Sequence, residues 1–99
     1  MIIEIQYVKM DTSESTDAFI TEKLEKLADK YDWLIRAVVY FKLENDPKGN
    51  GKICEIELSA PGPRIFAKSN AEHFEKAAMM TLGDLEKQIN KRKEILKRH

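Results

Sequence analysis

Two kinds of hydrophobic periodicity occur along this chain of 99 residues, and their order limits the folds that it can adopt. Residues 2–8, 35–44 and 52–60 place apolar side chains at alternate positions, which is typical of strands with one buried face. Residues 15–31 and a long C-terminal segment instead repeat apolar residues with the period of a helix. The apolar stripe of each helix and one face of the strands therefore have to share a core.

The residues between these segments predict where the elements begin and end. Ser13 or Ser15 can cap the first helix, because a serine hydroxyl accepts a hydrogen bond from a free amide of the first turn. Residues 45–51, Asn-Asp-Pro-Lys-Gly-Asn-Gly, join two alternating segments and predict a flexible hairpin loop.

The second half of the chain is divided by Pro61-Gly-Pro, which predicts a turn. A short strand is expected over residues 64–68, after which Ser69 or Asn70 can cap the last helix. Met79 and Met80 are expected to be packing residues of that helix. Its apolar stripe consists of Phe74, Ala77, Ala78, Leu82, Leu85, Ile89 and Leu96.

These elements predict an α+β fold with the order β-α-β-β-β-α in a single domain over residues 1–99. Three consecutive strands joined by short turns form an antiparallel meander, and both helices have to pack on one face of the four-stranded sheet. The opposite sheet face is expected to be more exposed, as Lys42, Glu55 and Glu57 indicate. An apolar content of 42% is sufficient for the core of one such domain.

Several classes of function find no support in the sequence. No apolar run approaches the ~20 residues of a membrane span, and the start lacks the features of a signal peptide, so we expect no membrane partner and a cytoplasmic location. Cys54 is expected to be a buried thiol, and with only His73 and His99 there is no metal-ligand set. Motifs for a nucleophile with its base, or for a phosphate loop, are also missing. We therefore expect no enzyme activity, no cofactor and no small-molecule substrate.

Charge is unevenly distributed along the chain. Residues 87–99 contain six cationic side chains and one acidic residue, Glu94, and so carry +5, whereas residues 1–86 carry −5 because the whole chain is neutral. A compact cationic cluster suits a polyanion such as RNA. The alternative is a solvated helix end that the helix dipole stabilises. The six cations are Lys87, Lys91, Arg92, Lys93, Lys97 and Arg98.

The first helix is predicted to be electrically two-sided. One flank carries Lys23, Lys26 and Lys30. The opposite side of the polar surface carries Glu22, Glu25 and Asp29. On the last helix a basic edge is formed by Lys76, Lys87, Lys91 and Arg98. If the helices pack side by side, the two basic edges are expected to face a common groove.

Five segments, in this order and spacing, resemble one known family over essentially the whole chain. They are Glu22-Lys-Leu-Glu-Lys-Leu, Val39-Tyr-Phe-Lys-Leu-Glu-Asn, Ile56-Glu-Leu-Ser-Ala-Pro-Gly, Phe66-Ala-Lys-Ser and Leu85-Glu-Lys-Gln-Ile-Asn-Lys-Arg-Lys. The chain resembles the short form of the hibernation-promoting factors, which are also called ribosome-associated translation inhibitors or sigma-54 modulation proteins.

The resemblance implies a domain similar to double-stranded-RNA-binding domains, in a bacterial protein of stationary phase and stress. Such a protein lodges in the decoding channel of the small ribosomal subunit, blocks the sites of messenger and transfer RNA, and silences idle ribosomes. The implied partner is ribosomal RNA, and an additional hibernation factor is left open as a second partner. Positions that match the family's RNA contacts are Lys23, Lys26, Lys87, Lys91 and Lys93. Local charge adds Lys30, Lys76, Arg92, Lys97 and Arg98.

Two positions depart from the family pattern. Met79 and Asp84 stand where many relatives have an acidic residue and a lysine, respectively. Because Asp84 places a negative charge on the basic edge, the affinity for RNA is expected to be reduced or the contact rearranged. Two other functions remain open: a stand-alone domain that binds free structured RNA, and a protein-interaction module that uses the exposed sheet face.

Overall fold

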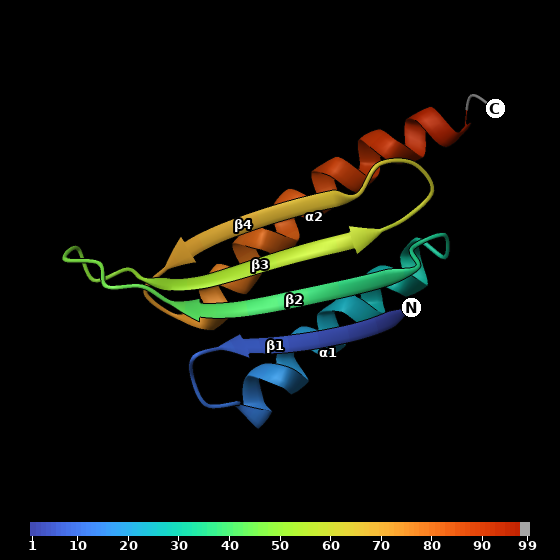
Figure 1. Cartoon of the computed structure of the whole chain (residues 1–99). Coiled ribbons are helices and arrows are strands. Elements are labelled where there is room, and N and C mark those ends of the chain that lie inside the picture. Colours follow the sequence, from blue (N-terminus) through green and yellow to red (C-terminus); the bar gives the residue numbers. More distant parts are fainter. Residues whose placement is uncertain (98–99) are drawn as a thin grey trace.

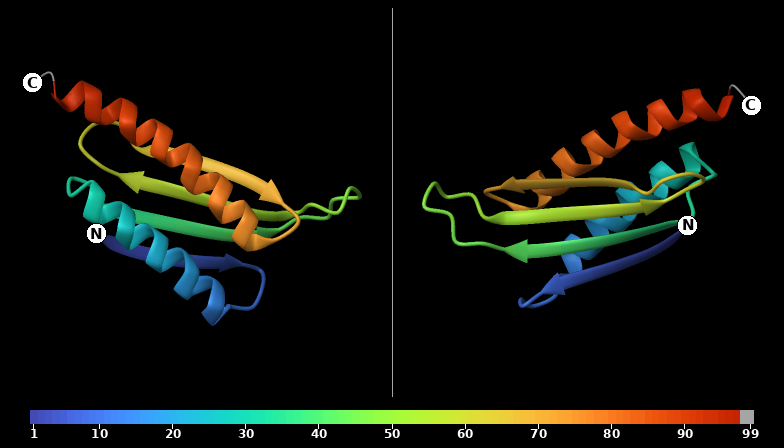
Figure 2. Two further views of the ribbon diagram at one scale, coloured as in Figure 1. Left: turned by 180° about the vertical axis from the view of Figure 1, so that it is seen from behind. Right: turned by 45° about the horizontal axis from the view of Figure 1, so that its top comes forward.

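The structure, a computed structural model, describes residues 1–97 as a mixed sheet with two helices across one of its faces (Figures 1 and 2). The four strands lie in chain order and are β1 (Ile2–Val8), β2 (Arg36–Leu43), β3 (Lys52–Ser59) and β4 (Ile65–Ala71). The helices are α1 (Glu14–Lys30) and α2 (Phe74–Lys97). β1 runs parallel to β2 because α1 connects them as a crossover, and the other neighbours are antiparallel. The predicted fold class and element order are confirmed.

The start of α2 differs from the sequence-based prediction. β4 continues to Ala71, so Ser69 and Asn70 belong to the strand and do not cap the helix, which begins at Phe74. Ser69 pairs in register with Cys54 of β3, and the Asn70 side chain accepts a hydrogen bond from the Gly51 backbone amide at 2.7 Å. The prediction was wrong because both residues extend β4 in register with β3, and the Asn70 side chain binds the loop that precedes β3.

The core lies between the inner face of the sheet and the two helices. Phe41 of β2 is fully buried at its centre. Its ring stacks on Tyr7 of β1 at a centroid distance of 5.3 Å and meets Phe74 of α2 edge-on at 5.6 Å. Burying large aromatic and aliphatic side chains supplies most of the driving force for folding. The helices contribute the fully buried Ile20 and Leu24 of α1 and Leu85 and Ile89 of α2.

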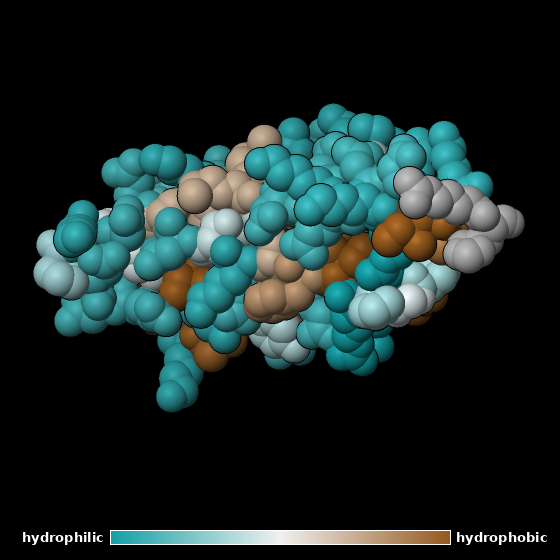
Figure 3. All heavy atoms as spheres, turned by 90° about the horizontal axis from the view of Figure 1, so that it is seen from above, coloured by the Kyte–Doolittle hydropathy of each residue, from teal (hydrophilic) through white to brown (hydrophobic). Residues whose placement is uncertain are grey.

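Three α2 side chains that were predicted to pack lie at the surface. Met79 and Met80 are 50% and 49% exposed, and Leu96 is 36% exposed. The last turns of α2, which include Leu96, extend beyond the sheet (Figure 2). Seen from above, the surface is mostly hydrophilic with separate apolar patches (Figure 3).

Arg92 connects α2 to the turn between β3 and β4 through hydrogen bonds. Its Nη1 and Nη2 atoms donate hydrogen bonds to the carbonyl oxygens of Pro61 and Pro63 at 2.6 and 2.7 Å. Gly62 lies between these prolines with φ of +94°, and a Cβ atom there would come within 3.0 Å of Arg92 Nη1. The positive φ favours glycine at this position, and a side chain there would also displace the Arg92 guanidinium from its hydrogen bonds.

Tyr7 ties the end of β1 to the start of α1. Its hydroxyl lies 2.8 Å from Asp17 Oδ1 and 3.0 Å from the Ser13 carbonyl oxygen. Ser13 is the helix cap, since its hydroxyl accepts a hydrogen bond from the Thr16 amide at 3.3 Å. Burial, followed by the bond to Asp17, raises the pKa of Tyr7 to about 12.

Replacing Tyr7 with Phe is expected to lower the free energy of unfolding by about 1 kcal/mol at pH 7, because a hydrogen bond between β1 and α1 is lost. This advantage of the natural protein should shrink as the pH rises from about 10 toward 12, because unfolded tyrosine ionises near pH 10 while folded Tyr7 keeps its proton. Urea unfolding of both proteins at pH 7 and at about pH 11 checks this. A stability difference that stays constant over this range would contradict it.

Cys54 and Thr81 are fully buried between β3 and α2. The Thr81 hydroxyl lies 3.0 Å from the Cys54 carbonyl oxygen and 2.9 Å from that of Ala77. Burial is the main cause that raises the pKa of the Cys54 thiol to about 12. We conclude that this cysteine is a packing residue, as predicted.

Cys54→Ser is expected to destabilise the protein by about 1–3 kcal/mol, because it buries a hydroxyl in an apolar site. Cys54→Ala is the control, since it removes the sulfur without adding a polar group. In urea unfolding, the serine variant should have a lower free energy of unfolding than the alanine variant. Fast reaction of the folded natural protein with a thiol reagent would show instead that the thiol is accessible.

Candidate nucleic-acid interface

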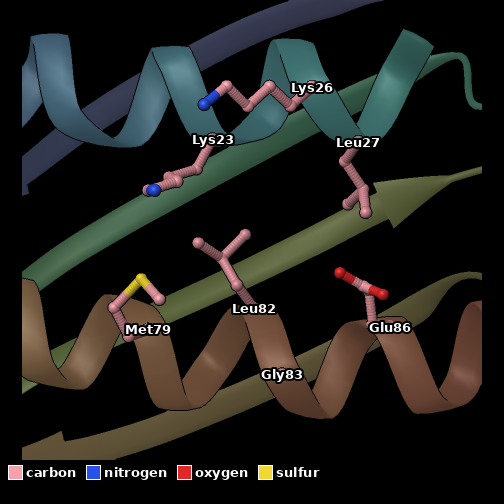
Figure 4. A pocket seen from close by; sticks show the side chains of 7 residues that line it. All are labelled: Lys23, Lys26, Leu27, Met79, Leu82, Gly83 and Glu86. Atoms are coloured by element: carbon pink, nitrogen blue, oxygen red, sulfur yellow. The ribbon is translucent and has the colours of Figure 1, made fainter. Parts of the chain in front are cut away.

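α1 and α2 lie side by side on the sheet (Figure 2). A groove of about 320 Å³ lies between them, and Figure 4 shows the side chains that line it. Leu27 points from α1 toward α2, and Leu82 points back toward α1, so the floor of the groove is apolar (Figure 4). The remaining lining residues are Lys23 and Lys26 of α1 and Met79, Gly83 and Glu86 of α2.

The lysine flank of α1 lies on the groove side of this helix. Lys23 and Lys26 line the groove, and Lys30 Nζ lies 3.5 Å from a Glu86 carboxylate oxygen of α2. Glu25 and Asp29 face the other way and line a separate cleft of about 310 Å³ beside β1. The predicted two-sided charge distribution of α1 is thus confirmed for these residues.

Glu22 departs from this prediction. Its carboxylate lies 3.2 Å from Lys26 Nζ one helical turn away, so it belongs to the lysine side and does not face away from it. The pair is exposed at both ends, and such pairs contribute little to stability. Glu25, which with Asp29 faces the β1 side, can therefore be removed without disturbing the lysines.

The basic edge of α2 does not line the groove. Lys87 and Lys91 are exposed, whereas α2 presents Met79, Gly83 and Glu86 to α1. The prediction of a common groove lined by lysines of both helices was wrong for these two residues. Lys87 follows Glu86 by one residue, a rotation of roughly 100°, and this turns its side chain toward solvent.

Cations from both helices meet at the C-terminal end of α1. The Lys30 and Lys93 ammonium groups lie 5.4 and 5.8 Å from the centroid of the Tyr31 ring. Tyr31 is 2% exposed, and its hydroxyl donates a hydrogen bond to Asn90 Oδ1 at 2.8 Å. Attraction to Glu86 is the main cause that raises the pKa of Lys30. Tyr31 directly follows Lys30 in the sequence, but its contact with Lys93 depends on how the two helices pack.

The other predicted RNA-binding residues lie elsewhere. Lys76 pairs with Glu72 at 3.2 Å near the start of α2. Arg92 is engaged by the β3–β4 turn, and Lys97 is exposed at the projecting end of α2. Arg98 lies outside the residues that the structure describes.

Gly83 is an unusual residue for the middle of a helix. Glycine inside a helix costs roughly 1 kcal/mol of stability relative to alanine. A Cβ atom at Gly83 would meet no heavy atom within 4 Å, so packing does not require glycine here. Its position on the groove means that the missing side chain leaves the groove wider.

The outer sheet face, the other candidate surface, pairs many of its charges across neighbouring strands. Lys42 and Lys68 lie 3.0 and 3.5 Å from Glu55. Two more ion pairs on this face are Arg36 with Glu4 and Arg64 with Glu57. Its charges are thus largely satisfied within the fold.

Neither a metal site nor a membrane-spanning helix is found in residues 1–97. Over residues 1–97 there is no group of three or more His, Cys, Asp and Glu side chains that could hold a metal ion. Within the same residues, no helix has the length and apolar character to cross a membrane.

Comparison with known proteins identifies a family. The sequence model of the sigma 54 modulation protein / S30EA ribosomal protein family matches residues 3–97. No curated protein sequence matches the chain.

Solved structures share the fold over most of the chain. A ribosomal subunit interface protein from Coxiella burnetii is similar with a TM-score of 0.84 and 22% identity, covering 95% of this chain and 99% of that one. The Protein Y N-terminal domain of Thermus thermophilus has a TM-score of 0.77 and 18% identity, with 92% and 98% of the two chains covered. Because the family model spans nearly the entire sequence, the chain belongs to the sigma 54 modulation protein / S30EA ribosomal protein family.

Proposed function

We propose that this protein binds the small ribosomal subunit through its RNA, occupies the decoding channel in place of messenger and transfer RNA, and inhibits translation by idle ribosomes in the cytoplasm. The observation that carries this proposal is family membership over residues 3–97, since the family includes a ribosomal protein by description. A structurally similar protein is a ribosomal subunit interface protein, which supports the same assignment.

The distribution of cations supports RNA as the partner. Lys23, Lys26 and Lys30 lie along the groove side of α1, and Lys93 joins Lys30 at the Tyr31 ring. Lys87 and Lys91 extend this positive surface over the exposed outer side of α2. Lysines distributed in this way can contact phosphates of folded RNA without reading its bases.

Under this proposal, the protein binds RNA and does not catalyse a reaction. Cys54, the one thiol of the chain, is buried with its pKa raised to about 12 and cannot act as a nucleophile at neutral pH. His73 is exposed and lies just before α2 begins at Phe74.

Changing Lys87, Lys91 and Lys93 together to Gln is expected to weaken association with the small subunit, while the fold survives because all three side chains are exposed. The slope of log affinity against log salt should flatten by about 0.7–0.9 for each lysine that had neutralised a phosphate. Sedimentation with purified small subunits through sucrose gradients, at several salt concentrations, measures both effects. Comigration of the natural protein only with free structured RNA would favour the stand-alone RNA-binding function instead.

The matched control is Glu25→Gln, which changes one charge on the β1 side of α1 and should leave binding unchanged or slightly stronger. Lys23 and Lys26 changed to Gln should weaken binding in the same direction as the triple variant. If the triple variant keeps the natural affinity and salt slope, the basic end of α2 is a solvated helix terminus.

Asp84→Lys is expected to tighten binding, because Asp84 is an exposed anion one helical turn from Lys87 on the outer side of α2. The gain should be larger at low salt than at high salt, since exposed charges are screened. Asp84→Asn is the control and should give a smaller gain of the same sign. Equal affinities of all three proteins at low salt would show that this side of α2 does not approach RNA.

A further inference from the structure

We propose that the groove between α1 and α2 holds one unstacked nucleobase of the bound RNA, and that the lysines at its rim hold the adjacent phosphates. This inference rests on the proposed RNA-binding function and adds the chemical class of ligand that the groove itself accepts.

The size and the lining of the groove suit a small ligand with an apolar face. Its volume of about 320 Å³ falls in the range of small-molecule sites. Leu27 and Leu82 form an apolar floor, and Met79, half exposed, forms one wall (Figure 4). Methionine is flexible and polarizable, so it can adapt to the face of an aromatic ring.

Gly83 is the second, independent observation. The fold gives no steric reason for glycine at this position, and a helix is less stable with glycine than with alanine. What the glycine provides is open space on the wall of the groove, where a ligand can approach the helix backbone. The groove is therefore wider than the packing of the two helices requires.

The polar groups around this apolar floor match the remaining parts of a nucleotide. Lys23 and Lys26 place positive charge at the α1 rim, where the phosphates flanking an inserted base would lie. Glu86 places an acceptor at the α2 rim, and its pair with Lys30 at 3.5 Å leaves carboxylate lone pairs available. A carboxylate accepts hydrogen bonds from the amino groups of cytosine, adenine and guanine, which uracil lacks. We therefore infer a preference for bases that carry an amino group.

The test uses the isolated protein and single-stranded oligoribonucleotides of about six residues, followed by NMR at the Gly83 amide and the Met79 methyl group. Oligonucleotides of cytosine or adenine are expected to shift both signals and to bind more tightly than those of uracil. Shifts confined to Lys87–Lys97, with Gly83 and Met79 unmoved, would overturn the proposal. The proposal would also be overturned if the Gly83 and Met79 signals shifted only with an acidic peptide that carries apolar side chains and not with any oligonucleotide.

Two substitutions at one position separate groove filling from helix stability. Gly83→Leu should fill the groove and weaken oligonucleotide binding about tenfold, a loss comparable with that of one stacked base. Gly83→Ala is the control, because it stabilises the helix in the same way but adds only a methyl group, and it should retain most of the binding. Equal binding by the leucine variant and the natural protein would overturn the proposal.

Glu86→Gln tests the basis of the preference. This variant should bind all the oligonucleotides more strongly because a negative charge is lost, but the ratio of cytosine to uracil affinity should fall. An unchanged ratio would show that Glu86 does not contact the base and would overturn the inferred preference.

The inference and the function on which it rests can fail separately. If the natural protein binds the small subunit and Gly83→Leu binds it equally well with no groove shifts, the ribosomal function stands and the groove proposal is wrong. If the natural protein does not sediment with the subunit, but oligonucleotides shift Gly83 and the leucine variant abolishes this, the groove proposal stands without the ribosome.

Discussion

The packing of both helices on one sheet face determines the rest of this structure. The sheet has one apolar face, centred on Phe41, and each helix has one apolar stripe, so α1 and α2 must lie side by side to bury them. Burial of Ile20 and Leu24 sets the rotation of α1, and burial of Leu85 and Ile89 sets that of α2. Once these rotations are set, every polar residue of the helices has a defined direction. The candidate interface is therefore a consequence of core packing.

The same rotations divide the cationic surface into two parts with different chemistry. On the groove side, lysines of α1 face the apolar and acidic residues of α2, so this part combines charge with a recessed apolar surface. On the outer side of α2, Lys87 and Lys91 are exposed to solvent and offer charge alone. Tyr31 links the two parts, because its buried ring brings Lys30 and Lys93 of different helices together. In the proposed complex the outer part contributes charge, and the groove can contribute selectivity.

The fold could be predicted from sequence because its signals are periodic and mutually consistent. The alternation in β1, β2 and β3 and the stripes of the helices each indicate one buried face. The start of α2 could not be predicted, because serine and asparagine suit a helix cap and a strand end equally well until β3 provides a partner for β4. Met79 and Glu86 face the groove because α1 and α2, which are distant in sequence, pack side by side. The periodicity of each helix alone does not show which of its faces meets the other helix. Gly83 was visible in the sequence, but its significance appears only with the open space around its Cβ position.

A neutral protein can bind a polyanion when its charges are segregated. Here Glu25 and Asp29 face the β1 side, the outer sheet face pairs many of its charges internally, and the lysines gather along the groove and the end of α2. Such a distribution exerts little net attraction at long range but a strong orienting effect at close range. In the proposed complex, RNA phosphates are repelled by the acidic side of α1 and attracted by its groove side, which selects one orientation of approach. In the proposed complex, this segregation of charge orients the protein on the RNA, with the apolar groove on the side that faces it.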